Sequence, residues 1–159
     1  SSNNDSISAA VISRKTGSWW RQIILNKGSK DGVEIGNTVV GPGGLLGRVK
    51  NTSLFTSSVT LLTSPESKVG VWVDRIQVNG LLVGLGDDYP SLILYSKDAD
   101  IKVGDLVSSS PASTLLPPNI PIGIVHSIDE PFKTKKTAKI SLLAKPYAID
   151  WVQILKVKI

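Results

Sequence analysis

The sequence contains no cysteine and no methionine among its 159 residues, and it has a single histidine. Without cysteine, the chain can form neither disulfides nor thiolate metal centres, and its stability must come from burial of apolar side chains. No apolar run approaches the roughly 18–20 consecutive residues that a membrane-spanning helix requires. The sequence therefore predicts no disulfide framework, no thiol chemistry and no membrane-spanning segment within this piece.

The missing methionine also bears on where the chain begins. A sequence that opens on the polar run Ser1 to Ser6 and has no initiator residue is expected to be a piece of a longer protein. A signal peptide or membrane anchor is then expected upstream.

The charge is mildly positive, with 18 lysines and arginines against 13 aspartates and glutamates, a net +5. One interpretation of the basic end is contact with nucleic acid or another anionic surface. The other is that the lysines cover the solvent side of exposed or edge strands and discourage edge-to-edge pairing. The lysines concerned are Lys133, Lys135, Lys136, Lys139, Lys145, Lys156 and Lys158.

Helical periodicity is almost absent, while short β-branched runs separated by glycine, proline, asparagine and aspartate recur along the chain. Such short strands at about 8–12-residue spacing predict an all-β fold built from barrels or sandwiches, and edge closure favours barrels. The expected strands are 9–13, 22–25, 38–40, 45–49, 58–62, 68–73, 77–83, 92–94, 106–108, 122–128, 139–143 and 152–158.

An internal repeat is the strongest pattern in the sequence. VEIGNTVV at residues 33–40 aligns with IKVGDLVS at 101–108, and each copy continues to a second glycine, Gly47 or Gly123, within an apolar strand. Glycine followed by asparagine or aspartate supplies a positive φ at a turn, so each copy is expected to form a strand, a tight turn and a strand. Gly47 and Gly123 are expected at a bulge, a bend or a close backbone contact.

The repeat predicts two small β-barrels in tandem, the first over residues 7–66 and the second over 67–150. The segment 64–67 is expected to be a hinge between them, and the last strand, 151–159, can close either barrel. We favour its return to the first barrel, because pairing of the two chain ends would protect both edges. The glycine-rich run 41–44 has no helix after it and is expected to be a wide hairpin loop rather than a phosphate cradle.

Candidates for catalysis and for metal or cofactor binding are few. His126 lies in a strand on the face opposite Val125, and no serine has the glycine-framed context of a hydrolase nucleophile. The acidic residues of 87–88 and 98–100 are interpreted as turn residues, since they do not form the dense ligand series of a calcium loop. We therefore expect no catalytic residue, no metal site, no cofactor and no enzymatic activity.

Aromatic residues amount to 6% of the chain, and their placement suggests where a partner binds. Trp72, alone in its strand, is expected in a core. Trp19 and Trp20 are adjacent on an extended chain and point to opposite faces, so at most one of them enters the same core. The other is expected to cover the barrel end or contact a partner, which makes Trp19, Trp20 and Arg21 the candidate partner-binding residues.

A series of short motifs in a fixed order resembles the extracytoplasmic domain of the MreC family of rod shape-determining proteins. The resemblance covers about residues 9–158, and Asn119 stands where that family commonly has glycine; asparagine tolerates the left-handed conformation. The motifs are WWR at 19–21, NKGSKDGV at 26–33, GGLLGRV at 43–49, LLTSPES at 61–67, GLLVG at 80–84, DADIKVGDLV at 98–107 and LPPNIPIG at 116–123.

This resemblance implies a bitopic protein of the bacterial inner membrane whose two barrels lie in the periplasm, held by an anchor upstream. The implied function is a scaffold for cell-wall elongation that binds the class B penicillin-binding transpeptidase and other elongation proteins and self-associates, without nucleic acid. Two alternatives stay open: a nucleic-acid-binding tandem of small barrels, and a hydrolase on a double barrel. The hydrolase would require His126 within hydrogen-bond reach of a serine and a carboxylate.

Overall fold

The structure is a computed structural model that describes residues 6–17, 21–132 and 134–156. Within these residues it is all-β, with two short 3-10 turns, η1 (Ser29–Asp31) and η2 (Pro146–Ala148). Each of the twelve segments expected to be a strand contains one. The strands are β1 (Ser6–Thr16), β2 (Arg21–Leu25), β3 (Thr38–Gly41), β4 (Gly44–Thr52), β5 (Ser57–Leu61), β6 (Lys68–Val73), β7 (Val78–Val83), β8 (Ser91–Leu94), β9 (Leu106–Ser109), β10 (Pro121–Ile128), β11 (Lys136–Leu142) and β12 (Trp151–Leu155).

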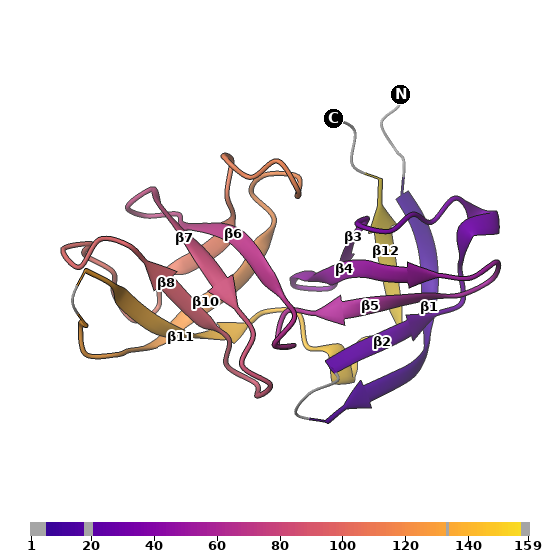
Figure 1. Cartoon of the computed structure of the whole chain (residues 1–159), viewed down its shortest axis with the longest axis horizontal. Coiled ribbons are helices and arrows are strands. Elements are labelled where there is room, and N and C mark those ends of the chain that lie inside the picture. Colours follow the sequence, from indigo (N-terminus) through magenta and orange to yellow (C-terminus); the bar gives the residue numbers. More distant parts are fainter. Residues whose placement is uncertain (1–5, 18–20, 133, 157–159) are drawn as a thin grey trace.

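The strands form two closed barrels side by side (Figure 1). The first has the ring order β1-β12-β3-β4-β5-β2, and the second has the order β10-β11-β8-β7-β6-β9. The expected fold class, two small barrels in tandem, is confirmed. The last strand, β12, pairs with β1 on one side and with β3 on the other, so the two ends of the described chain lie in the same barrel.

The two rings share one topology. The strands of barrel two can be numbered 1 to 6 along the chain, from β6 to β11, and those of barrel one can be numbered 1 to 6 as β12 followed by β1 to β5. With this numbering, neighbouring strands follow the same order, 1-2-3-6-5-4, around both rings. Barrel one is therefore a circular permutation of barrel two, with barrel two inserted between β5 and β12. The register agrees in detail, since β4 and β10 carry a bulge at the same point, after Val49 and after Val125.

The repeated turns match bond by bond. Gly36 has φ 92° and Gly104 has φ 95°, as expected for glycine at this corner. The side chains of Asn37 and Asp105 each accept a hydrogen bond from the backbone N–H three residues earlier, at 2.8 Å in both copies. The segments 33–35 and 101–103 form no strand, contrary to expectation, because their backbone leads directly into these side-chain-capped turns.

The second glycine of each copy is required by close packing of neighbouring strands. A Cβ on Gly47 would overlap the carbonyl oxygen of Thr60 in β5, and one on Gly123 would lie 2.6 Å from the carbonyl oxygen of Ser141 in β11. Both positions also adjoin a register shift. The expectation of a bulge or a close backbone neighbour is confirmed. Asn119 adopts the left-handed conformation expected for it, with φ 60°.

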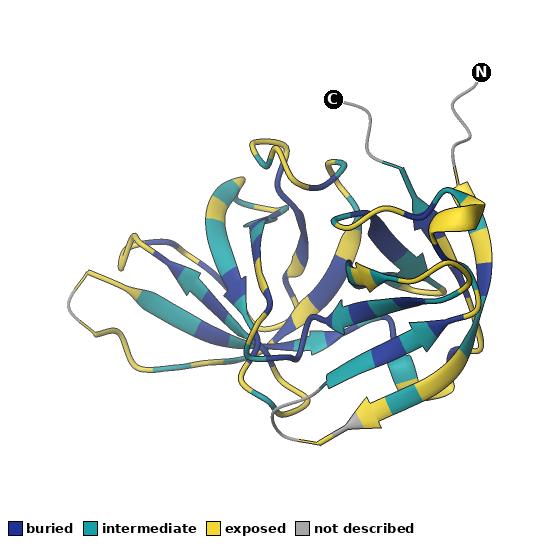
Figure 2. Cartoon of the chain, turned by 45° about the vertical axis from the view of Figure 1, so that its right-hand side comes forward, coloured by how far each residue is buried: buried dark blue, intermediate teal, exposed yellow. Residues whose placement is uncertain are grey.

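Each barrel has its own core, and Figure 2 shows buried residues alternating with exposed ones along the strands. Full burial of a leucine or isoleucine side chain contributes about 1.5–3 kcal/mol, so these cores dominate the stability of a chain without disulfides. The cores are not fully separate: Leu45 of β4 packs in the core of barrel two, whereas Ala144 and Ile149 pack in that of barrel one. The barrels therefore share apolar contacts at their junction.

The run 41–44 is a tight turn, not a wide loop. Gly41 pairs with Gly44, and Gly43, at φ 100°, follows Pro42, a sequence typical of a type II turn. The turn presses against barrel two: a Cβ on Gly43 would lie 2.5 Å from the carbonyl oxygen of Leu143. Space at the junction, rather than phosphate binding, explains the glycines.

The segment 64–67 connects the barrels but is held in place by the fold, and only Glu66 within it is exposed. Ser64 and Ser67 are buried, and the N–H of Ser67 donates to the carbonyl of Ser64 at 2.9 Å. The N–H of Gly84, in barrel two, donates to the carbonyl of Ser67 at 3.1 Å. The connection is thus a hydrogen-bonded part of the junction.

One further expectation is wrong, and another holds only in part. Trp72 is half-buried on the outer face of β6, since its neighbours Val71 and Val73 take the core positions. The lysines of β11 do not protect an edge, because β11 pairs with β8 on one side and with β10 on the other. Barrel closure removes the free edges that such lysines would guard.

Candidate partner-binding surface at the barrel junction

Arg21, a predicted partner-binding residue, bridges the two barrels. It begins β2, and its side chain is only 12% exposed. Its Nη1 lies 2.9 Å from Oδ1 of Asp88, in the loop between β7 and β8, and donates to the Tyr147 hydroxyl at 3.3 Å. The guanidinium is therefore engaged within the molecule. Trp19 and Trp20 lie outside the described residues, and their role stays a prediction.

His126 is exposed on the face of β10 opposite the buried Val125, as the strand alternation predicts. Its ring stacks on Tyr89, with the ring centroids 4.7 Å apart and the planes inclined by 26°. No serine or carboxylate in the described part of the chain forms a hydrogen bond or ion pair with it. The geometry is that of a surface aromatic pair, not of a Ser-His-Asp triad.

The described ranges contain no cluster of metal ligands and no membrane-spanning helix. No three histidine, aspartate or glutamate side chains within residues 6–17, 21–132 and 134–156 gather as metal ligands. Asp87 acts as a turn residue, since its Oδ1 accepts the N–H of Tyr89 at 2.9 Å. Over the same ranges, every helix is too short or too polar to span a bilayer.

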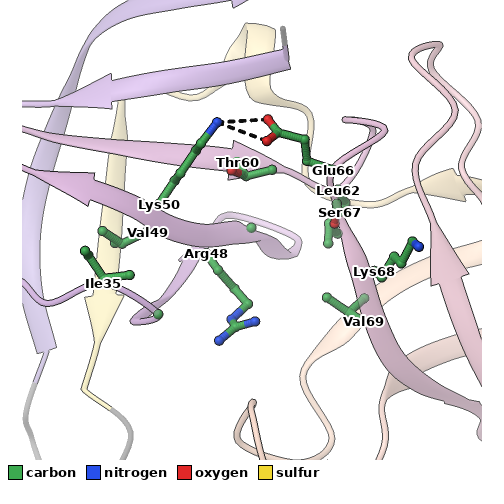
Figure 3. Close-up of a pocket in the computed structure, with 12 residues that line it drawn as sticks. Ile35, Arg48, Val49, Lys50, Thr60, Leu62, Glu66, Ser67, Lys68 and Val69 are labelled. Carbon is green, nitrogen blue, oxygen red and sulfur yellow. Dashed lines mark hydrogen bonds and ion pairs between the residues drawn. The ribbon is translucent and has the colours of Figure 1, made fainter. Parts of the chain in front are cut away.

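A groove of about 340 Å³ lies where β4 of barrel one meets the start of β6 (Figure 3). Its apolar lining includes Ile35, 68% exposed, which occupies the turn position that Val103, 66% exposed, occupies in the other copy. The groove residues are Ile35, Gly36, Gly47, Arg48, Val49, Lys50, Thr60, Leu62, Glu66, Ser67, Lys68 and Val69. We call this surface the junction groove.

The junction groove carries an excess of positive charge. Its one carboxylate, Glu66, binds Lys50 through both oxygens, at 3.0 and 3.1 Å (Figure 3). Arg48 and Lys68 form none of the ion pairs found among the described residues. The sequence analysis missed this groove, because residues 48 and 68 meet only through the tertiary structure.

A second feature missed from the sequence is an exposed tryptophan on the outer face of β12. Trp151 is 64% exposed and borders a shallow hollow of about 290 Å³ beside Pro42 of the junction turn. Exposed tryptophans are enriched among residues that dominate binding energy. Trp151 is therefore a further candidate anchor for a partner, in addition to the predicted anchors Trp19 and Trp20.

At the lysine-rich end, one cation is held by the fold. Lys136 donates to the backbone carbonyl of Ala99 at 2.9 Å, so its ammonium is held by the fold. Single-stranded nucleic acid is generally bound by cations interleaved with stacking aromatics. Phe132, the one aromatic residue beside the lysine cluster 133–139, pairs with Lys135 in an isolated bridge before β11.

Comparison with known proteins identifies the family. A family model described as the barrel core of the rod shape-determining protein MreC matches residues 11–156. The cell shape-determining protein MreC of Caulobacter vibrioides is 32% identical over 151 residues, which is 94% of this chain and 42% of that protein.

Solved structures agree with this match. The crystal structure of MreC from Pseudomonas aeruginosa has a TM-score of 0.88 at 26% identity, covering 96% of this chain and all of that one. Helicobacter pylori MreC, solved in complex with the penicillin-binding protein PBP2, has a TM-score of 0.73 at 17% identity and covers 96% and 98%. The chain spans about half the length of the curated relatives it matches. The resemblance drawn from the ordered motifs is confirmed, and the chain belongs to the MreC family of rod shape-determining proteins.

Proposed function

We propose that this chain is a non-enzymatic scaffold of cell-wall elongation, which controls rod shape by binding a peptidoglycan synthase. The observation that carries the proposal is the H. pylori relative, which shares the two-barrel fold and was solved bound to a penicillin-binding protein. The partner expected here is a class B transpeptidase of the same kind. Other wall-elongation proteins are expected to bind the same pair of barrels.

The junction between the barrels suits a scaffold. Two chain crossings, shared core residues and the Arg21 bridge hold the barrels in one relative orientation. A surface fixed in this way loses little conformational freedom on binding, which favours affinity. The exposed Trp151 and the junction groove supply the aromatic and charged contacts that partners use.

We place the barrels on the periplasmic face of the inner membrane, held by an anchor N-terminal to them, and expect the protein to self-associate. The support is family membership. Among the predicted partner-binding residues, Trp19 and Trp20 would act by direct contact. Arg21 would act indirectly, because its side chain holds the barrels together.

Calorimetric titration of the chain with the ectodomain of the transpeptidase tests the proposal. The tested variants are Trp19→Ala, Trp20→Ala and Trp151→Ala. The control is Tyr95→Ala, because Tyr95 is as exposed as Trp151 but lines neither the junction groove nor the hollow beside Trp151. We expect at least one tryptophan variant to bind about thirtyfold or more weakly, in line with hot-spot losses of 2 kcal/mol or more. Absence of binding by the unmodified chain contradicts the scaffold, and unchanged affinity of a tryptophan variant rejects that residue as an anchor.

A further inference from the structure

We infer that the junction groove binds an extended, acidic segment of a partner protein, and that Arg48 pairs with its carboxylate. The inference rests on the scaffold function proposed above and adds the chemistry of the contact. Four observations support the inference: the position of Arg48, the absence of an acceptor for its guanidinium, the charge balance of the groove and the apolar walls of the groove.

Arg48 is directed into the groove by the strand pattern. It lies in β4 between Thr38 of β3 and Thr60 of β5, and its neighbour Val49 points into the core of barrel one. Alternation along the strand therefore places Arg48 on the outer face. Figure 3 shows its guanidinium in the open space between β4 and the residues that begin β6.

The guanidinium of Arg48 has donors without acceptors. Its Nε is buried and has no hydrogen-bond partner, and no ion pair among the described residues includes it. The terminal nitrogens, which Figure 3 shows in the open groove, also form no hydrogen bond with the described residues, so an acceptor from outside can reach them. A carboxylate matches the planar fork of an arginine with two parallel hydrogen bonds.

The charges around Arg48 favour the same ligand. Glu66 is already bound to Lys50, while the exposed Lys68 lines the groove and takes part in none of the ion pairs among the described residues. The groove thus presents two uncompensated positive charges. Ile35 and Val69 are among the apolar residues that line the groove.

A protein segment fits this surface better than a nucleic acid. None of the twelve lining residues is aromatic, so there is nothing on which bases could stack. A volume of about 340 Å³ accommodates a few side chains, such as an acidic residue next to an aliphatic one. The combination of fork, second cation and apolar wall recognises acidic and aliphatic residues in alternation.

The test uses two fluorescent hexapeptides, one of alternating glutamate and valine and one with glutamine in place of each glutamate. Anisotropy titrations measure the affinity of the chain for both. We expect the glutamate peptide to bind at least about tenfold more tightly than the glutamine peptide, since hydrogen bonds to charged groups are the stronger class. Binding should weaken at higher ionic strength.

Three variants assign the effect to the groove. Arg48→Gln should lose at least tenfold in affinity for the glutamate peptide, and Arg48→Lys, which keeps the charge but not the fork, should lose less. Lys97→Gln removes one exposed positive charge that does not line the groove and should bind within twofold of the unmodified chain. Circular dichroism and thermal unfolding establish that each variant is folded.

Equal affinity of Arg48→Gln and the unmodified chain, or equal binding of both peptides, would overturn the inference. The same proteins are titrated in parallel with the transpeptidase ectodomain. Ectodomain binding without peptide discrimination refutes the groove and leaves the scaffold intact. Peptide discrimination without ectodomain binding supports the groove and contradicts the proposed partner.

Discussion

The substitution Gly84→Ala tests whether the connection between the barrels is rigid. Gly84 follows β7 and lies against the crossing segment, with its N–H bonded to the carbonyl of Ser67. An added Cβ would overlap the carbonyl oxygen of Ser64 and lie 2.6 and 2.7 Å from the carbonyl carbons of Ser64 and Thr63. Every one of these atoms belongs to the backbone, so the overlap can be relieved only if the segment that connects the barrels moves.

The size of the effect follows from how far the backbone must yield. Overpacking a well-packed site by one methyl group costs about 1–3 kcal/mol, and the upper half of that range applies when only backbone can move. We expect Gly84→Ala to lower the free energy of unfolding by about 2–3 kcal/mol, roughly a 30- to 150-fold change in the equilibrium. Gly70→Ala is the matched control, because its Cβ would meet only Ser113, at 3.7 Å. That substitution should be neutral or stabilise by about 0.4–1 kcal/mol through the unfolded chain.

Urea unfolding followed by circular dichroism and tryptophan fluorescence measures both variants, with coincident transitions required before the two are compared. Similar stabilities for Gly84→Ala and Gly70→Ala would refute the reasoning. The connection would then yield without cost, and the barrels would be joined by a hinge. That result would also contradict the fixed relative orientation of the barrels on which the proposed binding surface depends.

Three further predictions concern single residues. Gly36→Ala and Gly104→Ala should each destabilise by about 1–2 kcal/mol, and by similar amounts, because both repeated turns need φ near 90°; a cost at only one position in urea unfolding would contradict the equivalence of the copies. The hydrogen bond from Arg75, opposed by burial, lowers the pKa of Asp105 below its ordinary value of 3.8, so its stabilisation is complete above that value and is lost as the pH falls through the lower folded-state pKa. Asp105→Asn keeps an acceptor for the turn and should flatten the acid side of the stability profile; an unchanged profile speaks against the pair. Arg21→Gln should lower the melting temperature and broaden the transition, measured by calorimetry, as the barrels uncouple; a sharp transition at the original temperature would show that the bridge is dispensable.

Several features followed from local sequence alone. Alternating β-branched runs identify strands because the side-chain period of a strand is two, and glycine before asparagine or aspartate marks a turn because it adopts positive φ at little cost. The repeat was visible because residues 33–49 and 101–125 must satisfy the same turn and the same close strand contact. Asn119 was interpreted correctly for the same reason, since a left-handed φ is a property of one residue.

The errors share one cause. Trp72 was expected in a core because it is large and apolar, but the register of β6 gives the inward positions to its neighbours. The segment 64–67 has the composition of an exposed hinge, yet both barrels pack against it. The basic residues of β11 resemble edge protection, although closure leaves that strand paired on both sides. In each case packing by distant residues overrode a local preference.

By itself, therefore, the sequence determined the strands, the glycine-cornered turns, the twofold repetition and, through its ordered motifs, the family. Three other features depended on the folded chain: β12 closes the first barrel, Arg21 reaches Asp88 across 67 positions of sequence, and Arg48 and Lys68 line one groove. The physical reason is that strand and turn preferences arise from neighbouring residues. Ring order and the meeting of distant charges depend instead on which faces bury against each other when both barrels close.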